Sequence, residues 1–191
     1  MKLVVGLGNP GAEYRSTRHS VGFDVVDRLC ERHRASLQQK FKGELGRADI
    51  AGEPCILLKP LTYMNRSGIS VGLTREYFHV EPADIIVVHD EADLPFGRLR
   101  VKDGGGHAGH NGLRSIVESI GSAAFARVRV GVGKPERGDL ADHVLSRWSP
   151  EEREWLTDLL DRSADAVTEV VAKGVKAAMN RFNAAPAEGA R

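Results

Sequence analysis

The sequence predicts a single α/β domain, with a twisted, mixed β-sheet flanked by helices and a C-terminal helical segment. Short apolar runs rich in β-branched residues alternate with segments whose apolar residues recur at helical spacing. Two of these runs, 44–50 and 54–60, are separated by a turn, so we expect them to form an antiparallel hairpin. The length of 191 residues suits one domain. We therefore expect one domain over residues 1–183 and a disordered tail over 184–191.

Each element follows from the spacing of its apolar residues. Strands are predicted at 3–7, 44–50, 54–60, 85–89, 98–102 and 126–132, and helices at 20–34, 69–78 and 111–120. A long helix is predicted from Pro150 through Val171, and after a break at Gly174 a last helical segment runs to about Phe182. The run 85–89 shows no polar alternation, which indicates a central strand buried on both faces. Ser149, Pro150 and Glu152 form a strong start signal for the long helix, with the serine as its N-cap.

The composition excludes several classes of protein. Apolar residues make up 41% of the chain and charged residues 28%, as in ordinary globular proteins. No apolar run approaches the roughly 18 residues that a membrane span needs, and the N-terminal residues predict neither a signal peptide nor a transit peptide. The net charge of +1 argues against a nucleic-acid coat protein. Cys30 and Cys55 are expected to be buried thiols in a cytoplasmic protein.

Polar residues follow three of the predicted strands at the point where each strand ends. Asn9 follows the first strand, Asn65 follows the second strand of the hairpin, and Asp90 comes directly after the buried strand. Turn formation alone would explain Asn9, since Asn before Pro-Gly is a common turn, but it explains the other two less well. In open α/β sheets, ligands bind at the carboxyl ends of the strands. We therefore expect these side chains near a binding site.

His19 is the candidate catalytic base, because it lies at the predicted start of the first helix. A helix N-terminus lowers the pKa of an imidazole and so favours its neutral form. A neutral histidine beside an acid such as Asp90 can take a proton from water, while the carboxylate fixes its tautomer. The alternative, which residue statistics alone favour, is a capping or surface histidine.

A glycine-rich stretch over 104–109 leads into the helix predicted from Asn111. Glycines let a backbone approach a ligand closely, and the start of a helix suits an anion or an oxyanion. His107 and His110 have a spacing that two zinc ligands can have, but no further ligand stands at an established spacing from them. The sequence therefore predicts no metal site.

The chain lacks the sequence contexts of cofactor binding and of covalent catalysis. Gly6, Gly8 and Gly11 match the dinucleotide-binding pattern only formally, because a loop rather than a helix follows them. Ser70, between Gly68 and Gly72, falls inside a predicted helix rather than at a strand-to-helix elbow, and neither cysteine has the context of a nucleophile. We therefore expect no cofactor, and water activated by a base as the nucleophile that attacks an activated acyl bond.

Five motifs occur in one order along nearly the whole chain. They are VGLGNPG at 5–11 with Tyr14 and TRH at 17–19, KPLTYMNRSG at 59–68, HDEADLP at 89–95, GGGHAGHNG at 104–112, and RVGVG at 129–133. One of them alone would be weak, whereas five in order are highly specific. Together they resemble the bacterial-type peptidyl-tRNA hydrolase family.

The resemblance implies a monomeric α/β enzyme that cleaves the ester between a peptide and the terminal ribose of tRNA. It implies recycling of tRNA from aborted translation, with no metal or organic cofactor. By position, His19 matches the general base, Asp90 the acid that keeps it competent, and Asn9 the residue that helps separate peptidyl-tRNA from aminoacyl-tRNA. The matching substrate contacts are Tyr14, Tyr63, Met64, Asn65, His110 and Asn111. Many members have Phe where this chain has Tyr63, so the stacking face is kept and a hydroxyl is added.

Basic residues cluster at 98–102 and at 127–137, and the ordinary interpretation of such clusters is a solvated face. Under the resemblance, contacts with tRNA phosphates give some of these cations a role. The residues concerned are Arg100, Lys102, Arg129 and Lys134. Residues 134–143 are rich in Gly, Pro and charge, and we expect them to form a mobile flap over the peptide channel.

Two other functions are compatible with parts of the pattern. A non-catalytic RNA-binding scaffold of the same fold would have no need to keep His19 and Asp90 together, and both are present. A hydrolase of small-molecule esters or amides would need no basic surface. The sequence therefore favours the enzyme that acts on peptidyl-tRNA.

Overall fold

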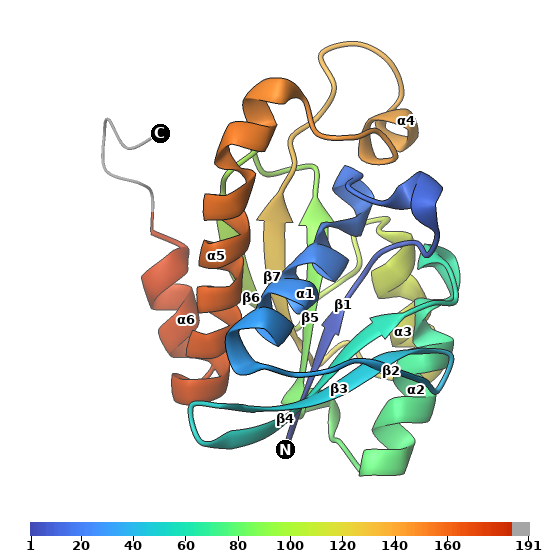
Figure 1. The fold of residues 1–191 in the computed structure, drawn as a ribbon, viewed down its shortest axis with the longest axis vertical. Helices are drawn as coiled ribbons and strands as arrows, with labels where there is room; N and C mark the ends of the chain where they lie inside the picture. The colour runs from blue at the N-terminus through green and yellow to red at the C-terminus, as the bar shows by residue number, and fades with distance from the viewer. Residues whose placement is uncertain (185–191) are drawn as a thin grey trace.

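The computed structural model describes residues 1–184, which form a seven-stranded mixed sheet with helices on both faces (Figure 1). The strands are β1 Lys2–Gly6, β2 Gln38–Lys40, β3 Gly43–Ile50, β4 Glu53–Pro60, β5 Ile85–Glu91, β6 Leu99–Asp103 and β7 Ala126–Gly131. The α-helices are α1 Val21–His33, α2 Ser67–Phe78, α3 Asn111–Ile120, α4 Leu140–Val144, α5 Pro150–Lys173 and α6 Val175–Phe182. Short 3-10 turns are η1 Ala12–Tyr14, η2 Arg18–Ser20, η3 Met64–Arg66 and η4 Pro82–Asp84.

The central strands run parallel, so their carboxyl ends meet at one edge of the sheet. The strand order is β2-β3-β4-β1-β5-β7-β6, and β1 pairs in parallel with both β4 and β5, while β5 pairs in parallel with β7. The hairpin β3–β4 and the edge pair β6–β7 are antiparallel. The segments that follow β1, β4 and β5 therefore start at the same edge, which lies toward the top of the molecule in Figure 1.

The sheet separates two apolar layers. On one face, α1, α5 and α6 pack against strand residues that include Val4 and Val88. On the other face, α2 and α3 cover strand residues that include Val5 and Val87. Alternate residues of β1 and β5 thus enter different layers. Both strands are buried on both faces, which for β5 confirms the prediction from its uninterrupted apolar run.

Two glycines bring α1 unusually close to β1. A Cβ atom added to Gly6 would lie 2.1 Å from the carbonyl oxygen of Gly22, and one added to Gly22 would lie 2.4 Å from the backbone nitrogen of Leu7. Any larger residue at either position would push the helix away from the strand. This close approach holds the start of α1, and the turn before it, against the carboxyl end of β1.

The predicted fold class is confirmed, and the differences are confined to short elements. The sequence predicts neither β2 nor α4. All three residues of β2 are exposed, so they show no apolar alternation, and the strand exists because it pairs with β3 across a tight turn. In that turn Phe41 and Lys42 have φ values of 53° and 57°, where glycine or asparagine is the usual residue.

The predicted flap over 134–143 contains most of α4. Asp139 is the N-cap of this short helix, and its side chain accepts a hydrogen bond from the backbone N–H of Ala141 at 3.2 Å. Motion of the segment stays a prediction. The predicted tail over 184–191 lies outside the described residues apart from Ala184.

None of the helices within residues 1–184 is long and apolar enough to cross a membrane. Of the two thiols expected to be buried, Cys55 is buried and Cys30 is only half-buried. Burial raises the pKa of each thiol to about 11. Both therefore stay protonated and unreactive at neutral pH.

Candidate active site

Three titratable side chains meet where the carboxyl end of β5 faces the start of α3. His19 comes from η2, Asp90 from β5, and His110 is the N-cap of α3. His19 Nδ1 lies 2.8 Å from Asp90 Oδ2, and His110 Nε2 lies 2.9 Å from Asp90 Oδ1. The carboxylate thus contacts both histidines directly, with one oxygen for each. We call these three residues the histidine–aspartate cluster.

Hydrogen bonds around the cluster indicate which ring nitrogens carry a proton. His110 Nδ1 accepts from the backbone N–H groups of Gly112 and Leu113, at 3.2 and 3.3 Å, so it is unprotonated. The proton of His110 then lies on Nε2, which donates to Asp90, and only the carbon face of this ring is left for a substrate. Asp90 accepts the Nδ1 proton of His19 in the same way. In the neutral ring, His19 Nε2 is therefore the nitrogen that can act as a base.

Electrostatics keep Asp90 ionised and make His19 more basic. Asp90 is 3% exposed. Burial alone would raise its pKa, but the charges and hydrogen bonds of His110 and His19 hold that pKa well below its usual range. For His19, burial lowers the pKa, yet the neighbouring carboxylate outweighs burial and raises the pKa above its ordinary value. The expectation of a lowered pKa for His19 is therefore wrong, because the carboxylate dominates over any effect of the following helix.

A buried neighbour, His89, packs against the cluster. Its ring is 1% exposed and lies edge-on to the ring of His110, with centroids 4.9 Å apart. His89 Nδ1 lies 2.8 Å from the backbone carbonyl oxygen of Asp90, to which it donates. Burial lowers the pKa of His89 to about 3, so this ring is neutral at physiological pH. Nothing in the sequence pattern separates this packing histidine from a reactive one.

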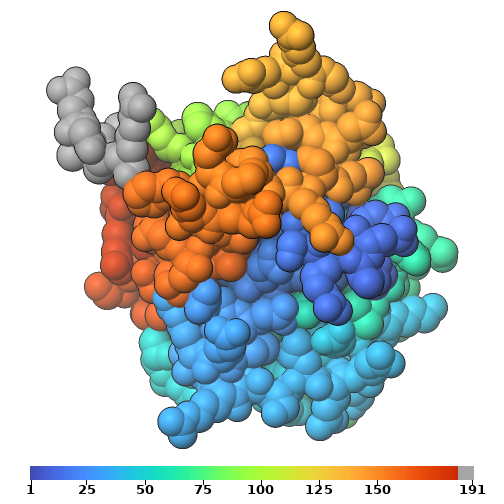
Figure 2. Space-filling view, turned by 45° about the horizontal axis from the view of Figure 1, so that its top comes forward, coloured from blue at the N-terminus to red at the C-terminus, as the bar shows by residue number. Residues whose placement is uncertain are grey.

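A partly buried ion pair holds the turn that carries His19. Arg18 is 7% exposed and pairs with Glu152 at the start of α5. The same guanidinium donates to the hydroxyl of Ser146 and, at 3.0 Å, to the carbonyl oxygen of Arg147. The chain before α5 therefore lies against the turn before α1. Figure 2 shows this contact as the orange segment beside the blue N-terminal segment.

Asn9 joins the segment after β1 to the segment after β4. Its side-chain oxygen accepts from the backbone N–H of Met64 at 2.7 Å, and its own backbone N–H donates to Ser20 Oγ at 3.1 Å. Because the oxygen is engaged, the amide NH₂ of Asn9 is left as a hydrogen-bond donor. Met64 is 4% exposed, so its side chain belongs to the core beneath the site.

The remaining predicted substrate contacts lie on more exposed segments. Tyr14 and Tyr63 meet edge to face with ring centroids 6.4 Å apart, and Tyr63 is 51% exposed. Tyr63 also has a φ of 64°, a left-handed conformation that strains an aromatic residue. Asn65 is exposed in η3, and the exposed Asn111 accepts a hydrogen bond from Arg114. These four predicted contacts are separate from the hydrogen-bonded cluster, and we call them the rim.

The predicted phosphate contacts fall into two groups. Arg100 and Lys102 are exposed on β6, at the edge of the sheet, and form no ion pair within residues 1–184. Arg129 and Lys134 each pair with an acidic side chain at 2.8 Å. The first two cations are open to an anion, whereas the other two must exchange a partner to bind one.

The cluster also has the donor spacing of a metal site. One ligand atom from each of its three residues lies within 4.8 Å of the others. Two histidines and a carboxylate are a ligand set that zinc or non-haem iron accepts. The two ring nitrogens that face Asp90 are, however, engaged by the carboxylate, and a metal would have to displace both hydrogen bonds. Hydrogen bonding alone accounts for the positions of all three side chains.

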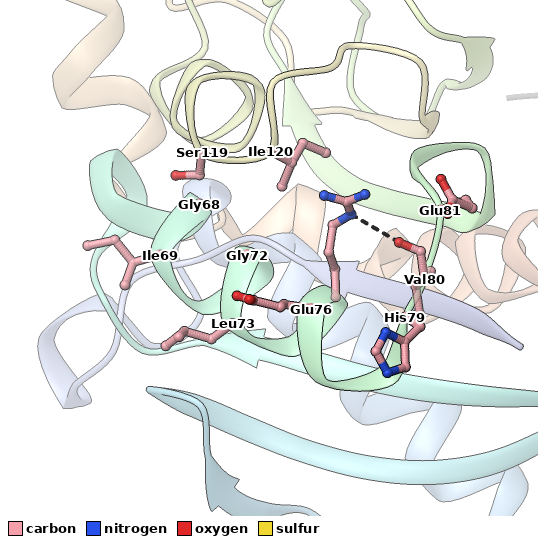
Figure 3. Close-up of a pocket in the computed structure, with 11 residues that line it drawn as sticks. Gly68, Ile69, Gly72, Leu73, Glu76, His79, Val80, Glu81, Ser119 and Ile120 are labelled. Atoms are coloured by element: carbon pink, nitrogen blue, oxygen red, sulfur yellow. Dashed lines mark hydrogen bonds between the residues drawn. The ribbon is translucent and has the colours of Figure 1, made fainter.

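A separate groove of about 620 Å³ lies between α2 and α3 (Figure 3). Its lining includes Gly72 and Glu76 of α2 and Ser119 of α3. Arg75 also lines the groove, and its Nε donates to the carbonyl oxygen of Val80 at 3.0 Å. No residue of the histidine–aspartate cluster lines this groove. The groove is therefore separate from the candidate catalytic residues, which are those of the histidine–aspartate cluster.

The chain matches one protein family over nearly its whole length. A family model described as peptidyl-tRNA hydrolase matches residues 3–189. The chain belongs to the peptidyl-tRNA hydrolase family. A peptidyl-tRNA hydrolase from Sorangium cellulosum is 53% identical over 195 aligned positions, which cover all of this chain and 87% of the relative. Another, from Geobacter sulfurreducens, is 48% identical over 183 positions, with 95% of each chain covered.

A solved peptidyl-tRNA hydrolase has the same fold. The crystal structure of the protein from Acinetobacter baumannii superposes on this chain with a TM-score of 0.89 at 40% identity. The match covers 96% of this chain and 95% of that one. The family and the fold class expected from the five motifs are therefore confirmed.

Proposed function

We propose that this member of the peptidyl-tRNA hydrolase family cleaves the ester between the peptide and the ribose at the 3′ end of tRNA, with His19 as the general base. The observation that carries the assignment of roles is the contact between His19 Nδ1 and Asp90. It leaves Nε2 as the basic nitrogen at the strand ends, where α/β proteins bind ligands. We further propose that the enzyme acts as a monomer in the cytoplasm, without a cofactor.

The reaction needs one proton transfer in each direction. His19 Nε2 takes a proton from water as the water oxygen attacks the ester carbonyl carbon. Asp90, 2.8 Å from Nδ1, stabilises the imidazolium that forms. The bond between the carbonyl carbon and the ribose oxygen then breaks, and the imidazolium returns its proton to the leaving oxygen. The products are a peptide carboxyl group and a ribose hydroxyl on tRNA.

Asn9 is the proposed donor to the oxyanion. Its side-chain oxygen is engaged by Met64, so the amide NH₂ is the group left to donate. One such donor typically contributes about 10²–10³-fold to the rate. A donor also favours the carbonyl of a blocked amino group over the ammonium of aminoacyl-tRNA, because an ammonium cannot accept a hydrogen bond. This preference would separate the two kinds of tRNA.

The rim and the basic residues are proposed to hold the rest of the substrate. Tyr14 and Tyr63 offer aromatic faces for stacking, and the amides of Asn65 and Asn111 can bind the peptide backbone without adding charge. The carbon face of His110 is proposed to contact the substrate as well, while the buried side chain of Met64 supports this region from the core. Phosphates of tRNA are assigned to Arg100, Lys102, Arg129 and Lys134.

The proposal is tested with an N-acetylated aminoacyl-tRNA. The wild-type protein should release the N-acetyl amino acid, and it should act far more slowly on the same tRNA with a free amino group. Binding of tRNA without release would show the RNA-binding scaffold instead. Equal activity on a small-alcohol ester of the same acid, unaffected by salt, would show the small-molecule hydrolase.

A further inference from the structure

Arg127 is a buried cation near the start of β7, and no carboxylate of the described residues pairs with it. The residue is 1% exposed and forms no ion pair within residues 1–184. Its guanidinium donates instead to the backbone carbonyl oxygens of Gly105 and Gly106, and to that of Ala123 at 3.3 Å. The expectation of a solvated face over 127–137 is therefore wrong for this residue, because the glycine-rich loop folds over it.

The two glycine carbonyls determine where the adjacent N–H groups point. In a trans peptide the N–H points opposite to the C=O, and the described chain has no cis peptide. Because the carbonyls of Gly105 and Gly106 point at Arg127, the N–H groups of Gly106 and His107 point away from it. Neither N–H donates a hydrogen bond within the part of the chain that the structure describes, and both glycines are exposed. Consecutive outward N–H groups form an anion-binding arrangement.

A second cation lies against the same loop. Lys102 stands opposite Arg127 in the β6–β7 register, so the two side chains share one face of the sheet. A Cβ atom added to Gly105 would lie 2.7 Å from Lys102 Nζ, which places the ammonium against the loop. Gly105 also has a φ of 107°, which other residues rarely adopt. Arg127 lies behind the N–H groups and Lys102 lies beside them, and two positive charges at these positions favour a negatively charged ligand.

We infer that Arg127 is a positioning residue that holds the N–H groups of Gly106 and His107 outward to bind a phosphate of the RNA substrate. The identity of the ligand rests on the proposed function, since a phosphodiester is the anion that tRNA supplies. Arginine suits this position because its planar fork can hold two carbonyl oxygens at once and keeps its charge when buried. Lysine, with a single ammonium centre, would hold the loop less firmly.

The first test uses the wild-type protein and the amide NMR signals of the loop. The probes are a ribodinucleotide with one phosphodiester, inorganic phosphate, and adenosine, which has no phosphate. The amide signals of Gly106 and His107 should shift with the dinucleotide and stay in place with adenosine. Equal shifts with inorganic phosphate at the same concentration would overturn the RNA phosphate as the ligand. No shift with any probe would overturn the site itself.

The second test compares Arg127→Gln and Arg127→Lys with a matched control, Arg75→Gln. Arg75 also donates to a backbone carbonyl oxygen, but in the separate groove. Arg127→Gln should raise KM for N-acetyl-aminoacyl-tRNA about tenfold or more, the loss expected for one or two charge-assisted hydrogen bonds. Arg127→Lys should lie between Arg127→Gln and wild type, and the control should match wild type.

A phosphate-free substrate separates positioning from general destabilisation. With N-acetyl-aminoacyl-adenosine, kcat and KM of Arg127→Gln should stay within about twofold of wild type. Equal losses on both substrates would show that Arg127 only supports the fold, and would overturn the inference. If Arg127→Gln does not fold, Arg127→Lys and the NMR test decide. If the wild type cleaves neither substrate, the proposed function fails, while the amide shifts still decide the phosphate site.

Discussion

The histidine–aspartate cluster and the basic edge of the sheet hold their charges in different ways. In the cluster, Asp90 is 3% exposed and each of its oxygens contacts one histidine. The basic edge consists of Arg100, Lys102, Arg129 and Lys134; the first two are exposed and form no ion pair with any described residue, and the other two are paired. Removing one partner of a buried pair leaves a charge uncompensated, whereas an exposed ion pair such as that of Lys134 exchanges its partner at little cost. The cluster should therefore control kcat, and the edge should control KM and its salt dependence.

The largest effect is expected for His19→Ala. Loss of the general base should lower kcat by about 10²–10⁴-fold, whereas affinity for tRNA should stay within about twofold because no phosphate contact is removed. Single-turnover release of the N-acetyl amino acid measures the first quantity, and a tRNA-binding assay measures the second. His79→Ala removes an exposed histidine that lines the separate groove, and it should be fully active. Wild-type kcat in His19→Ala would rule out the cluster as the catalytic centre.

A smaller loss of kcat, roughly 10–10²-fold, is expected for Asp90→Asn. Asp90 raises the pKa of His19, so its removal lowers that pKa and the ring stays neutral to lower pH. The acid limb of the kcat/KM profile should therefore move to lower pH, while the plateau falls because the base is weaker. Rates measured between about pH 5 and pH 9 show both changes. An acid limb at its wild-type position would mean that a group other than His19 titrates.

The sequence could predict which residues lie at the carboxyl ends of the strands, but not the contacts between them. The carboxyl ends of parallel strands follow from the apolar runs alone, so Asn9 and Asp90 could be placed at one edge of the sheet. The contact of His110 with Asp90 could not be predicted, because it depends on how the start of α3 packs across β5. The direction of the pKa shift of His19 could not be predicted either. It depends on the distance of 2.8 Å between His19 and Asp90, which the sequence does not contain.

Structure that depends on segments distant in the sequence could not be predicted either. In β7, Arg127 and Arg129 alternate with apolar residues, a pattern typical of a strand with one solvated face. Arg127 is buried because residues 104–109 fold over it, and nothing local to β7 indicates that cover. The fold class was predictable because the long apolar runs determine it. The short strand β2 was not, because it depends on backbone pairing with β3.

At the basic edge, Lys102→Ala should raise KM for N-acetyl-aminoacyl-tRNA about three- to tenfold and leave kcat unchanged. The slope of log KM against log salt concentration should fall by about one, as expected for one phosphate contact. Arg100→Ala should behave in the same way. N-acetyl-aminoacyl-adenosine is the control substrate, because it carries no phosphate and its KM should not change. Equal effects on both substrates would refute the phosphate contacts.

The smallest effect is expected where a cation of the edge is already paired. Lys134 and Asp93 lie 2.8 Å apart with more than half of each side chain exposed, and the hydrogen bond and charge of Lys134 lower the pKa of Asp93. Asp93→Asn should leave the unfolding temperature unchanged. It should lower KM for tRNA by no more than about twofold at low salt, because Lys134 then needs no exchange of partner to reach a phosphate. If neither Asp93→Asn nor Lys134→Ala changes KM or its salt dependence, Lys134 has no role in binding. The proposed phosphate contacts are then limited to Arg100 and Lys102 on β6 and Arg129 on β7.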